Sequence, residues 1–232
     1  EFKFTSLNQT SQKSSPNSTM KSISQFPLFS LECIETVSAH GRSQIGKGGG
    51  GTVHLIRHKA LPSLLFAMKK IPLTRHLGLS EVFEEIQVHR ELRHPNIVRL
   101  FGAQVRAQSV YLFLELASKG DLFAYISGRS RPRARLSPGQ KFKIFFQVVR
   151  AIEFLHAKGV IHRDLKPENV LLDADFNAKI CDFGWAIELA NHGRKRSLCG
   201  TVEYMAPEVY SGEVQTSKTD VWALGTAPFP NP

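Results

Sequence analysis

Apolar residues between positions 41 and 116 occur in short runs that glycine and proline separate. The runs are rich in β-branched and aromatic residues, so they predict an antiparallel sheet. One segment differs, because glutamates follow Ser80 and suit the first turns of a helix that has Ser80 as its N-cap. The expected strands are Thr52 to Arg57, Leu65 to Ile71, Val98 to Val105 and Ser109 to Leu116, and the expected helix carries Glu81, Glu84 and Glu85.

Helical spacing replaces this pattern in the second half of the chain. Ser137 and Pro138 suit the N-cap and first turn of a helix that continues to His156, and Gly159 follows its expected end. The two halves together predict an α+β fold, with a sheet and one helix followed by a mainly helical part. One buried helix face is expected from Phe142, Phe145, Phe146, Val149 and Ile152.

The first 38 residues lack an apolar period and are rich in Ser, Thr, Gln and Asn. Such a composition is typical of a flexible segment, so residues 1–38 are expected to form a leader. The sheet part is then expected over residues 39–116 and the helical part over residues 117–232.

Composition places the chain among ordinary globular proteins, since 42% of its 232 residues are hydrophobic and 22% are charged. No apolar stretch is long enough to cross a bilayer and no signal-peptide pattern is present, so a cytoplasmic or nuclear location and no membrane partner are expected. The three cysteines are scattered and predict neither a disulfide framework nor a zinc site.

The net charge is +10, and basic residues cluster at 129–135 and at 194–196. Such clusters can attract acidic partners, including nucleic acid. No nucleic-acid motif or base-stacking set of aromatic residues accompanies them, which favours solvated loops, and nucleic acid is not an expected partner.

A glycine-rich segment, IGKGGGGTV at 45–53, lies between two expected strands. Gly46, Gly48 and Gly51 fit the frame GxGxxGxV, in which glycines let backbone N–H groups approach phosphates. A flexible hairpin explains this segment equally well if it is taken alone. The next strand carries Lys69 and the following helix carries Glu85, so the lysine can reach nucleotide phosphates and pair with the glutamate.

Two longer motifs follow in the second half, HRDLKPEN at 162–169 and DFG at 182–184. Phosphoryl transfer needs a carboxylate beside the attacking hydroxyl, a cation near the phosphate and oxygen ligands for Mg²⁺. Asp164 and Lys166 supply the first two, and Asn169 with Asp182 supplies the metal ligands. The order and separation of the motifs argue against a chance run of polar loop residues, and predict ATP and Mg²⁺ as cofactors.

From about residue 41 to residue 225 the chain resembles eukaryotic protein kinases. DLKPEN and GTVEYMAPE resemble the serine/threonine branch, while DFGWA at 182–186 and RKRSLCGTVEYMAPE at 194–208 are most similar to Aurora kinases. A checkpoint-type or other basophilic kinase is the open alternative. The resemblance implies a bilobal fold, with a small antiparallel β-sheet N-lobe that holds one key helix and a larger, mainly helical C-lobe.

The resemblance also implies an adenine site between the lobes. Leu114 corresponds to the gatekeeper and Asp121 to the residue beside the ribose, while the main chain of Glu115 and Ala117 meets adenine. Thr201 is expected to bond the catalytic Asp and Lys. The residues expected to pack on the adenine ring are Val53, Ala67 and Leu171.

A stack of side chains joining the lobes is implied as well. Leu100, His89, Phe183 and His162 correspond to this regulatory spine. His89 is polar where an apolar residue is usual, so either a structural role or a pH-sensing role is open, and its expected position favours the structural one.

Regulation is expected in the segment that follows DFG. Ser197 comes after three basic residues and corresponds to a phosphorylated residue whose phosphate would pair with Arg163, with an unmodified serine as the alternative. Glu168 would select an Arg near the acceptor hydroxyl, so the expected partners are protein substrates with Ser or Thr near Arg or Lys, and an activating protein. Cys181 and Cys199 are expected to be inert thiols, with oxidation as the alternative.

The last motif, DVWALG at 220–225, begins a helix that in the resembled family anchors the catalytic loop. The proline-rich TAPFPNP after it cannot continue a helix, so the C-lobe is expected to be incomplete and to lack the Arg partner of Glu208. An active kinase is the expected function. A truncated, non-catalytic ATP-binding or interaction protein, either dominant-negative or a scaffold, is the alternative.

Overall fold

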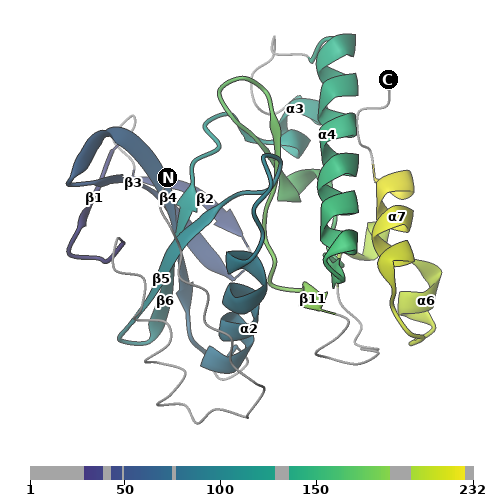
Figure 1. The fold of residues 1–232 in the computed structure, drawn as a ribbon, viewed down its shortest axis with the longest axis horizontal. Helices are drawn as coiled ribbons and strands as arrows, with labels where there is room; N and C mark the ends of the chain where they lie inside the picture. The colour runs from purple at the N-terminus through teal and green to yellow at the C-terminus, as the bar shows by residue number, and fades with distance from the viewer. Residues whose placement is uncertain are drawn as a thin grey trace.

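The computed structural model describes residues 29–38, 43–48, 50–74, 77–128, 136–188 and 200–227. A twisted sheet with helix α2 (Leu79–Arg90) beside it forms one lobe, and helices α4 (Pro138–Ala157) and α7 (Ser217–Thr226) belong to the other (Figure 1). The α+β, two-lobed arrangement expected from the sequence is therefore the observed fold.

Among the described residues, the N-lobe sheet has six antiparallel strands in the order β1-β3-β4-β6-β5, with β2 also paired to β3. Alternation along β4 and β6 sends Phe66, Met68 and Phe113 to an outer cluster and leaves Ile71 and Leu112 to pack on α2. The strands are β1 (Ile34–Thr36), β2 (Gln44–Gly48), β3 (Gly51–His58), β4 (Leu61–Pro72), β5 (Leu100–Arg106) and β6 (Ser109–Glu115).

Residues 34–36 form a strand of this sheet, which corrects the expectation that the leader extends to residue 38. Strand β1 pairs with β3, and Phe29 is only 8% exposed because its ring lies 5.0 Å from that of Phe66 and 5.5 Å from that of Phe101. The segment is short and its apolar residues follow no simple period. The position of this segment therefore depends on its packing against the outer face of the sheet, which the sequence pattern alone does not indicate.

Helix α2 begins two residues earlier than expected from an N-cap at Ser80. Its N-cap is Gly78, while Ser80 lies inside the helix and donates to the carboxylate of Glu81 at 2.9 Å. A side chain at position 78 would lie 2.8 Å from that carboxylate, which favours glycine there. The helix turns Glu85 and His89 toward the core together with its apolar residues.

Helix α4 begins where the sequence predicts. Ser137 is the N-cap, its hydroxyl accepts from the N–H of Gln140, and the Gln140 side chain accepts from Ser137 N–H, which completes a capping box. Gly159 follows the helix with a φ of 71°, in the left-handed region that favours glycine.

The buried face of α4 differs from the expected one. Phe142 and Phe146 are 56% and 55% exposed, Val149 is also exposed, and Phe145 is partly buried against the core. At 100° per residue the exposed stripe lies about 140° around the helix from the residues that enter the core, so the helix carries two apolar stripes and only one is covered. The buried residues are Ile144, Val148, Ala151, Ile152 and Leu155.

The remaining elements surround the loops that carry the motifs. Strands β7 (Gly120–Asp121), β9 (Val170–Leu172) and β10 (Ala178–Ile180) form a small sheet, and β8 (Val160–Ile161) pairs with β11 (Ile187–Glu188). None of the helices described is long and apolar enough to span a bilayer. The short helices are α3 (Leu122–Ile126), α6 (Pro207–Tyr210), η1 (Pro167–Asn169) and η2 (Val202–Tyr204).

The segment before β5 is held to the C-lobe strand β10. Val98 N–H donates to Ile180 O at 2.9 Å, and Ile180 N–H donates to Asn96 O at 2.8 Å. The Asn96 side chain adds a 2.9 Å hydrogen bond to Ala178 O. Residues 96–98 are therefore tied to the C-lobe, although they lie between two N-lobe elements.

Candidate active site

Asp164, Lys166 and Thr201 form a closed hydrogen-bonded group at the end of β8. The Thr201 hydroxyl donates to Asp164 Oδ1 at 2.7 Å, and Lys166 Nζ donates to the Thr201 oxygen at 2.7 Å. Lys166 Nζ also lies 3.0 Å from Asp164 Oδ2. The group holds a carboxylate and a cation side by side, as needed next to an acceptor hydroxyl and a transferring phosphate.

Asp220 fixes the main chain of this loop from α7. Its carboxylate accepts from the N–H of His162 at 3.0 Å and from the N–H of Arg163 at 2.9 Å, and it lies 2.8 Å from His156 Nε2. Arg163 has a φ of 68°, a left-handed conformation that a non-glycine residue adopts at a cost of about 1 kcal/mol or more. The buried carboxylate stabilises that conformation, which agrees with the anchoring role expected for this helix.

Asn169 and Asp182 are brought together by a main-chain hydrogen bond. Cys181 N–H donates to Asn169 O at 2.9 Å, and the Asn169 amide group donates to Asp164 Oδ2 at 3.0 Å. This leaves the amide oxygen of Asn169 and the Asp182 carboxylate as hard oxygen ligands, which is the donor type that Mg²⁺ prefers. Asp182 has a φ of 64°, so both motifs contain a left-handed non-glycine residue.

Lys69 links these loops to the N-lobe. Its Nζ lies 3.0 Å from Asp182 Oδ1 and 3.7 Å from Glu85 Oε1. Burial acts to lower the pKa of Lys69, but the two carboxylates outweigh it and hold the pKa above its ordinary value. Burial raises the pKa of Glu85, while Lys69 outweighs burial at Asp182 and holds that pKa below its ordinary value. Lys69 is therefore positively charged and faces an ionised Asp182.

Three members of the expected stack between the lobes lie in contact, namely His89, Phe183 and His162. The ring of Phe183 lies 4.6 Å from that of His89 and 5.2 Å from that of His162, while Leu100 packs in the cluster between α2 and the sheet. His89 Nε2 lies 2.6 Å from Val98 O, and burial lowers the pKa of His89 to about 4. The ring is neutral and hydrogen-bonded, which agrees with the structural role.

Strand register brings the expected adenine residues to one face of the sheet. Val53 pairs with Lys69, and Ala67 pairs with Leu114, so all four lie on the face that Lys69 occupies. In the small C-lobe sheet, Leu171 pairs with Asp121. The main-chain groups of Glu115 and of Ala117 follow Leu114 at the crossing between the lobes.

The three glycines of the hairpin differ in what a side chain would meet. At Gly51 a Cβ would lie 2.3 Å from the Lys70 carbonyl oxygen, so glycine is needed for strand pairing. Among the residues that the structure describes, nothing lies within 4 Å of a Cβ placed at Gly48, and only Val53 does at Gly46. The open backbone at Gly48, with Lys69 and the two oxygen ligands, fits the phosphates and metal of a nucleotide. ATP bound there would supply the phosphoryl group, and Mg²⁺ would neutralise the negative charge of the phosphates.

The regulatory prediction is only partly within the described structure, because Ser197 and Cys199 lie outside it. Arg163 donates from Nε to Trp185 O at 2.7 Å and from Nη1 to Gln215 Oε1 at 3.2 Å. Burial raises the pKa of Cys181 to about 12, so this thiol remains protonated, in agreement with the inert interpretation.

Three side chains near the site were not found from the sequence. Lys179 forms an ion pair with Glu115, and Gln215 is buried against Arg163. Neither belongs to a motif, and only the three-dimensional structure brings them to residues far away in the chain. Thr219 was likewise missed, and its hydroxyl donates to Glu208 at 2.8 Å.

The two lobes and the arrangement of these motifs are those of a phosphotransferase fold. The chain belongs to the protein kinase domain family, whose model matches residues 39–229. Within it, the chain is similar to the Aurora kinase of Schizosaccharomyces pombe, with 38% identity over 187 residues that make up 80% of this chain and 51% of the relative. The Aurora kinase of Encephalitozoon cuniculi is 36% identical over 78% of this chain and 66% of its own length. The human cAMP-dependent protein kinase catalytic subunit PRKX is 36% identical over 88% of this chain and 54% of its own length. The chain thus spans between about half and two thirds of these curated relatives.

Proposed function

We infer that this chain transfers the γ-phosphate of ATP, with Mg²⁺, to Ser or Thr hydroxyls of proteins, as an Aurora-like kinase. The observation that carries the proposal is the closed group of Asp164, Lys166 and Thr201, with its 2.7 Å hydrogen bonds. Asp164 accepts the hydroxyl proton, Lys166 stabilises charge on the transferred phosphate, and Lys69 orients the nucleotide phosphates. Asn169 and Asp182 would hold the metal.

A preference for basic substrates is part of the proposal. Glu168 Oε2 is buried and has no hydrogen-bond partner among the described residues. Burial and then the carboxylates of Glu168 and Glu203 raise the pKa of Tyr204, which marks a locally negative potential. A buried oxygen without a partner is costly, so an Arg of the substrate that reaches it gains a charge-assisted hydrogen bond.

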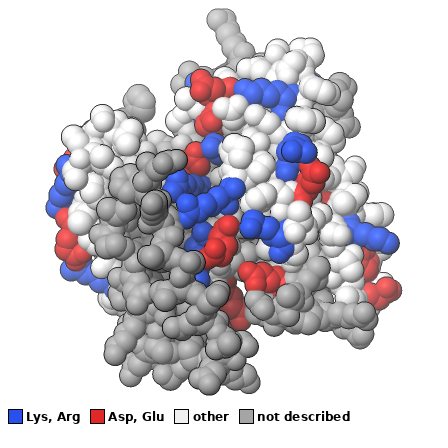
Figure 2. All heavy atoms as spheres, in the orientation of Figure 1, with Lys and Arg blue, Asp and Glu red and all other residues white. Residues whose placement is uncertain are grey.

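Charges of both signs are interspersed on the face of the molecule in Figure 2, so no single continuous basic surface covers the residues described there. Control by phosphorylation of Ser197 is a further part of the proposal, in which the phosphate would pair with Arg163 of the catalytic loop. Similarity to Aurora kinases is the basis for proposing an activating protein partner.

Transfer of radiolabelled γ-phosphate to an Arg-rich Ser/Thr peptide tests the activity. The parent chain and Asp164→Asn are compared, since the amide keeps the shape of the carboxylate but cannot take up the proton. Transfer by the parent alone supports the proposal. A folded parent that binds ATP and transfers nothing contradicts it and favours the alternative, a non-catalytic ATP-binding or interaction protein.

Specificity is tested with two peptides that differ by a single Arg→Ala change near the acceptor. The parent is expected to prefer the Arg peptide by about 10- to 100-fold in kcat/KM, and Glu168→Gln is expected to lose most of that preference. An equal preference in both proteins would assign the selectivity to another group. Glu153→Gln, an exposed change on α4, is the matched control.

A further inference from the structure

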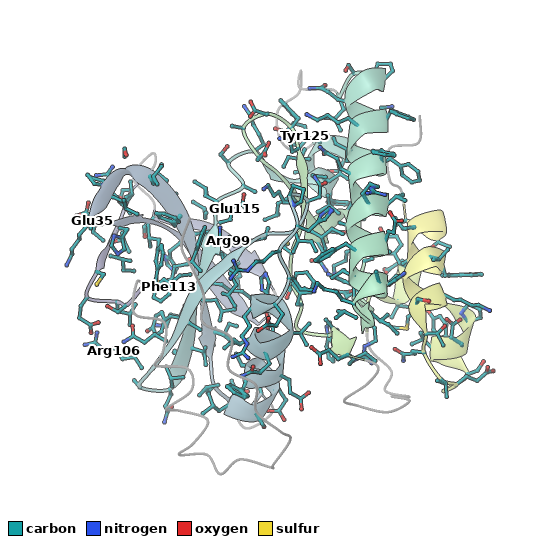
Figure 3. The ribbon with its side chains drawn as sticks, in the orientation of Figure 1. Glu35, Arg99, Arg106, Phe113, Glu115 and Tyr125 are labelled. Atoms are coloured by element: carbon teal, nitrogen blue, oxygen red, sulfur yellow. The ribbon has the colours of Figure 1, made fainter. Side chains whose placement is uncertain are left out.

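Glu115 is held from both lobes at the point where the chain crosses between them. Its Oε2 accepts from the N–H of Arg99 at 3.1 Å, and its own N–H donates to Arg99 O at 2.9 Å. Its Oε1 accepts from Lys179 Nζ at 2.5 Å. Figure 3 shows Arg99 and Glu115 close together between the sheet and the helical lobe. Both carboxylate oxygens are therefore used, one toward each lobe.

Lys179 reaches this position because of the register of the small sheet. It is the middle residue of β10, where Ala178 and Ile180 on either side are completely buried in the C-lobe core. Alternation turns Lys179 to the opposite face, and it pairs with Leu171, which in turn pairs with Asp121. Lys179, Leu171 and Asp121 thus lie in one row across the sheet, on the face proposed to lie under the nucleotide.

The ion pair is also sheltered from water. The side chains of Lys179 and Glu115 are 12% and 30% exposed, whereas the pairs Arg57–Glu35 and Arg106–Glu32 on the N-lobe have side chains between 36% and 66% exposed. A shielded pair is screened less by salt and holds its geometry better than an exposed one.

We propose that Lys179 is a positioning residue for the nucleotide base: through its ion pair with Glu115 it fixes the main chain at Glu115 and Ala117 so that their polar groups meet the adenine edge. The inference rests on the proposed function, because it assumes that ATP binds at this crossing. Fixing the carbonyl of Glu115 before binding reduces the entropy lost when the adenine 6-amino group donates to it. Lys179 itself touches no reacting atom.

The test measures KM for ATP and kcat for the parent, Lys179→Met and Lys179→Arg in the full chain. Lys179→Met is expected to raise KM for ATP about 5- to 20-fold with kcat changed less than about 2-fold, because the pair acts on base binding and not on phosphate chemistry. Lys179→Arg keeps the pair and is expected to restore KM. Glu35→Gln removes an exposed pair within the N-lobe and is the control, with unchanged constants.

A second measurement separates base positioning from a general loss of structure. Purine riboside triphosphate lacks the 6-amino group, so the parent should use it with a KM about 10-fold above that for ATP. In Lys179→Met this penalty should shrink to less than about 3-fold, since the carbonyl that reads the amino group is no longer held in place. A merely destabilised protein would lose affinity for both nucleotides equally.

The outcomes distinguish this inference from the proposed function. A parent that neither binds ATP nor transfers phosphate contradicts the proposed function itself. An active parent whose Lys179→Met variant keeps both the KM for ATP and the full penalty for the missing amino group overturns the positioning role and leaves the kinase assignment intact. An unchanged thermal midpoint in Lys179→Met accompanies the expected result.

Discussion

Thr201 donates a 2.7 Å hydrogen bond from its hydroxyl to Oδ1 of Asp164, although 37 residues separate them in the chain. The hydroxyl oxygen of Thr201 also accepts from Lys166 Nζ, so one hydroxyl orients both the proposed base and the proposed cation. The segment that carries Thr201 thereby determines whether the catalytic loop has its productive side-chain arrangement.

Replacing Thr201 by Val removes this hydroxyl with almost no change in shape. We expect kcat to fall about 10- to 100-fold while KM for ATP stays within about 2-fold, because the orientation of Asp164 and Lys166 is lost but the nucleotide site is not touched. Thr201→Ser keeps the hydroxyl and should retain most of the activity. Steady-state transfer kinetics measure both, and wild-type kcat in the Val variant would contradict the role of the hydroxyl.

Replacing Asp182 by Asn removes the carboxylate that pairs with Lys69 at 3.0 Å and is proposed to bind the metal. Transfer should fall about 1,000-fold or more across a Mg²⁺ titration, with the fold preserved by circular dichroism. Asp175→Asn changes an exposed carboxylate in the turn after β9 and serves as the control. Undiminished transfer by Asp182→Asn would sink the metal assignment.

Stability should depend on pH through His89. Burial lowers its pKa from 6.5 to about 4, so the unfolded chain binds more protons than the folded one between these pH values. The free energy of unfolding therefore falls as the pH is lowered from about 6.5 to about 4, and this side chain accounts for a loss of about 2 kcal/mol at pH 5.

The His89→Gln variant isolates that contribution. Glutamine can still donate to Val98 O but does not titrate, so the drop in unfolding free energy between pH 7.5 and pH 5 should be about 2 kcal/mol smaller than in the parent. Urea unfolding at the two pH values measures it. Equal drops in both proteins would mean that His89 is not buried in its neutral form.

Phe29 should contribute to stability despite its place near the start of the described chain. Phe29→Ala is expected to lower the free energy of unfolding by about 3–5 kcal/mol, as for other buried Phe side chains, because the ring fills a site among aromatic neighbours. Phe146→Ala on α4 removes a ring that is 55% exposed and should change it by less than about 1 kcal/mol. Similar effects of the two substitutions would argue against the packed position of Phe29.

The sequence predicted most of the elements because their local signals agree with their burial. Strands β3 to β6 coincide with apolar β-branched runs, and Ser137 begins α4 through a capping box that its own side chain makes. The motif residues come together as their order implied, with Lys69 beside Asp182 and Asn169 beside Asp164, since the resemblance carries three-dimensional information that periodicity does not.

The errors have a common physical origin, because they concern choices that only tertiary packing makes. Helix α4 has two apolar stripes, and nothing local distinguishes Phe142 and Phe146 from the stripe that the core selects. Ser80 is a good N-cap, yet the chain enters α2 at Gly78. The pair Lys179–Glu115 joins residues 64 positions apart, with no motif to indicate it.

Strand β10 has a mechanical consequence, because it is bonded to two separate N-lobe segments, one before β5 and one at the end of β6 where the chain crosses to the C-lobe. Residues 96–98 hydrogen-bond to its main chain, and Lys179 of the same strand holds Glu115. Two attachment points on the same strand define one rotation axis for the lobes. Rotation of the lobes is thereby restricted to opening and closing about that line, and twisting or sliding would require these bonds to break.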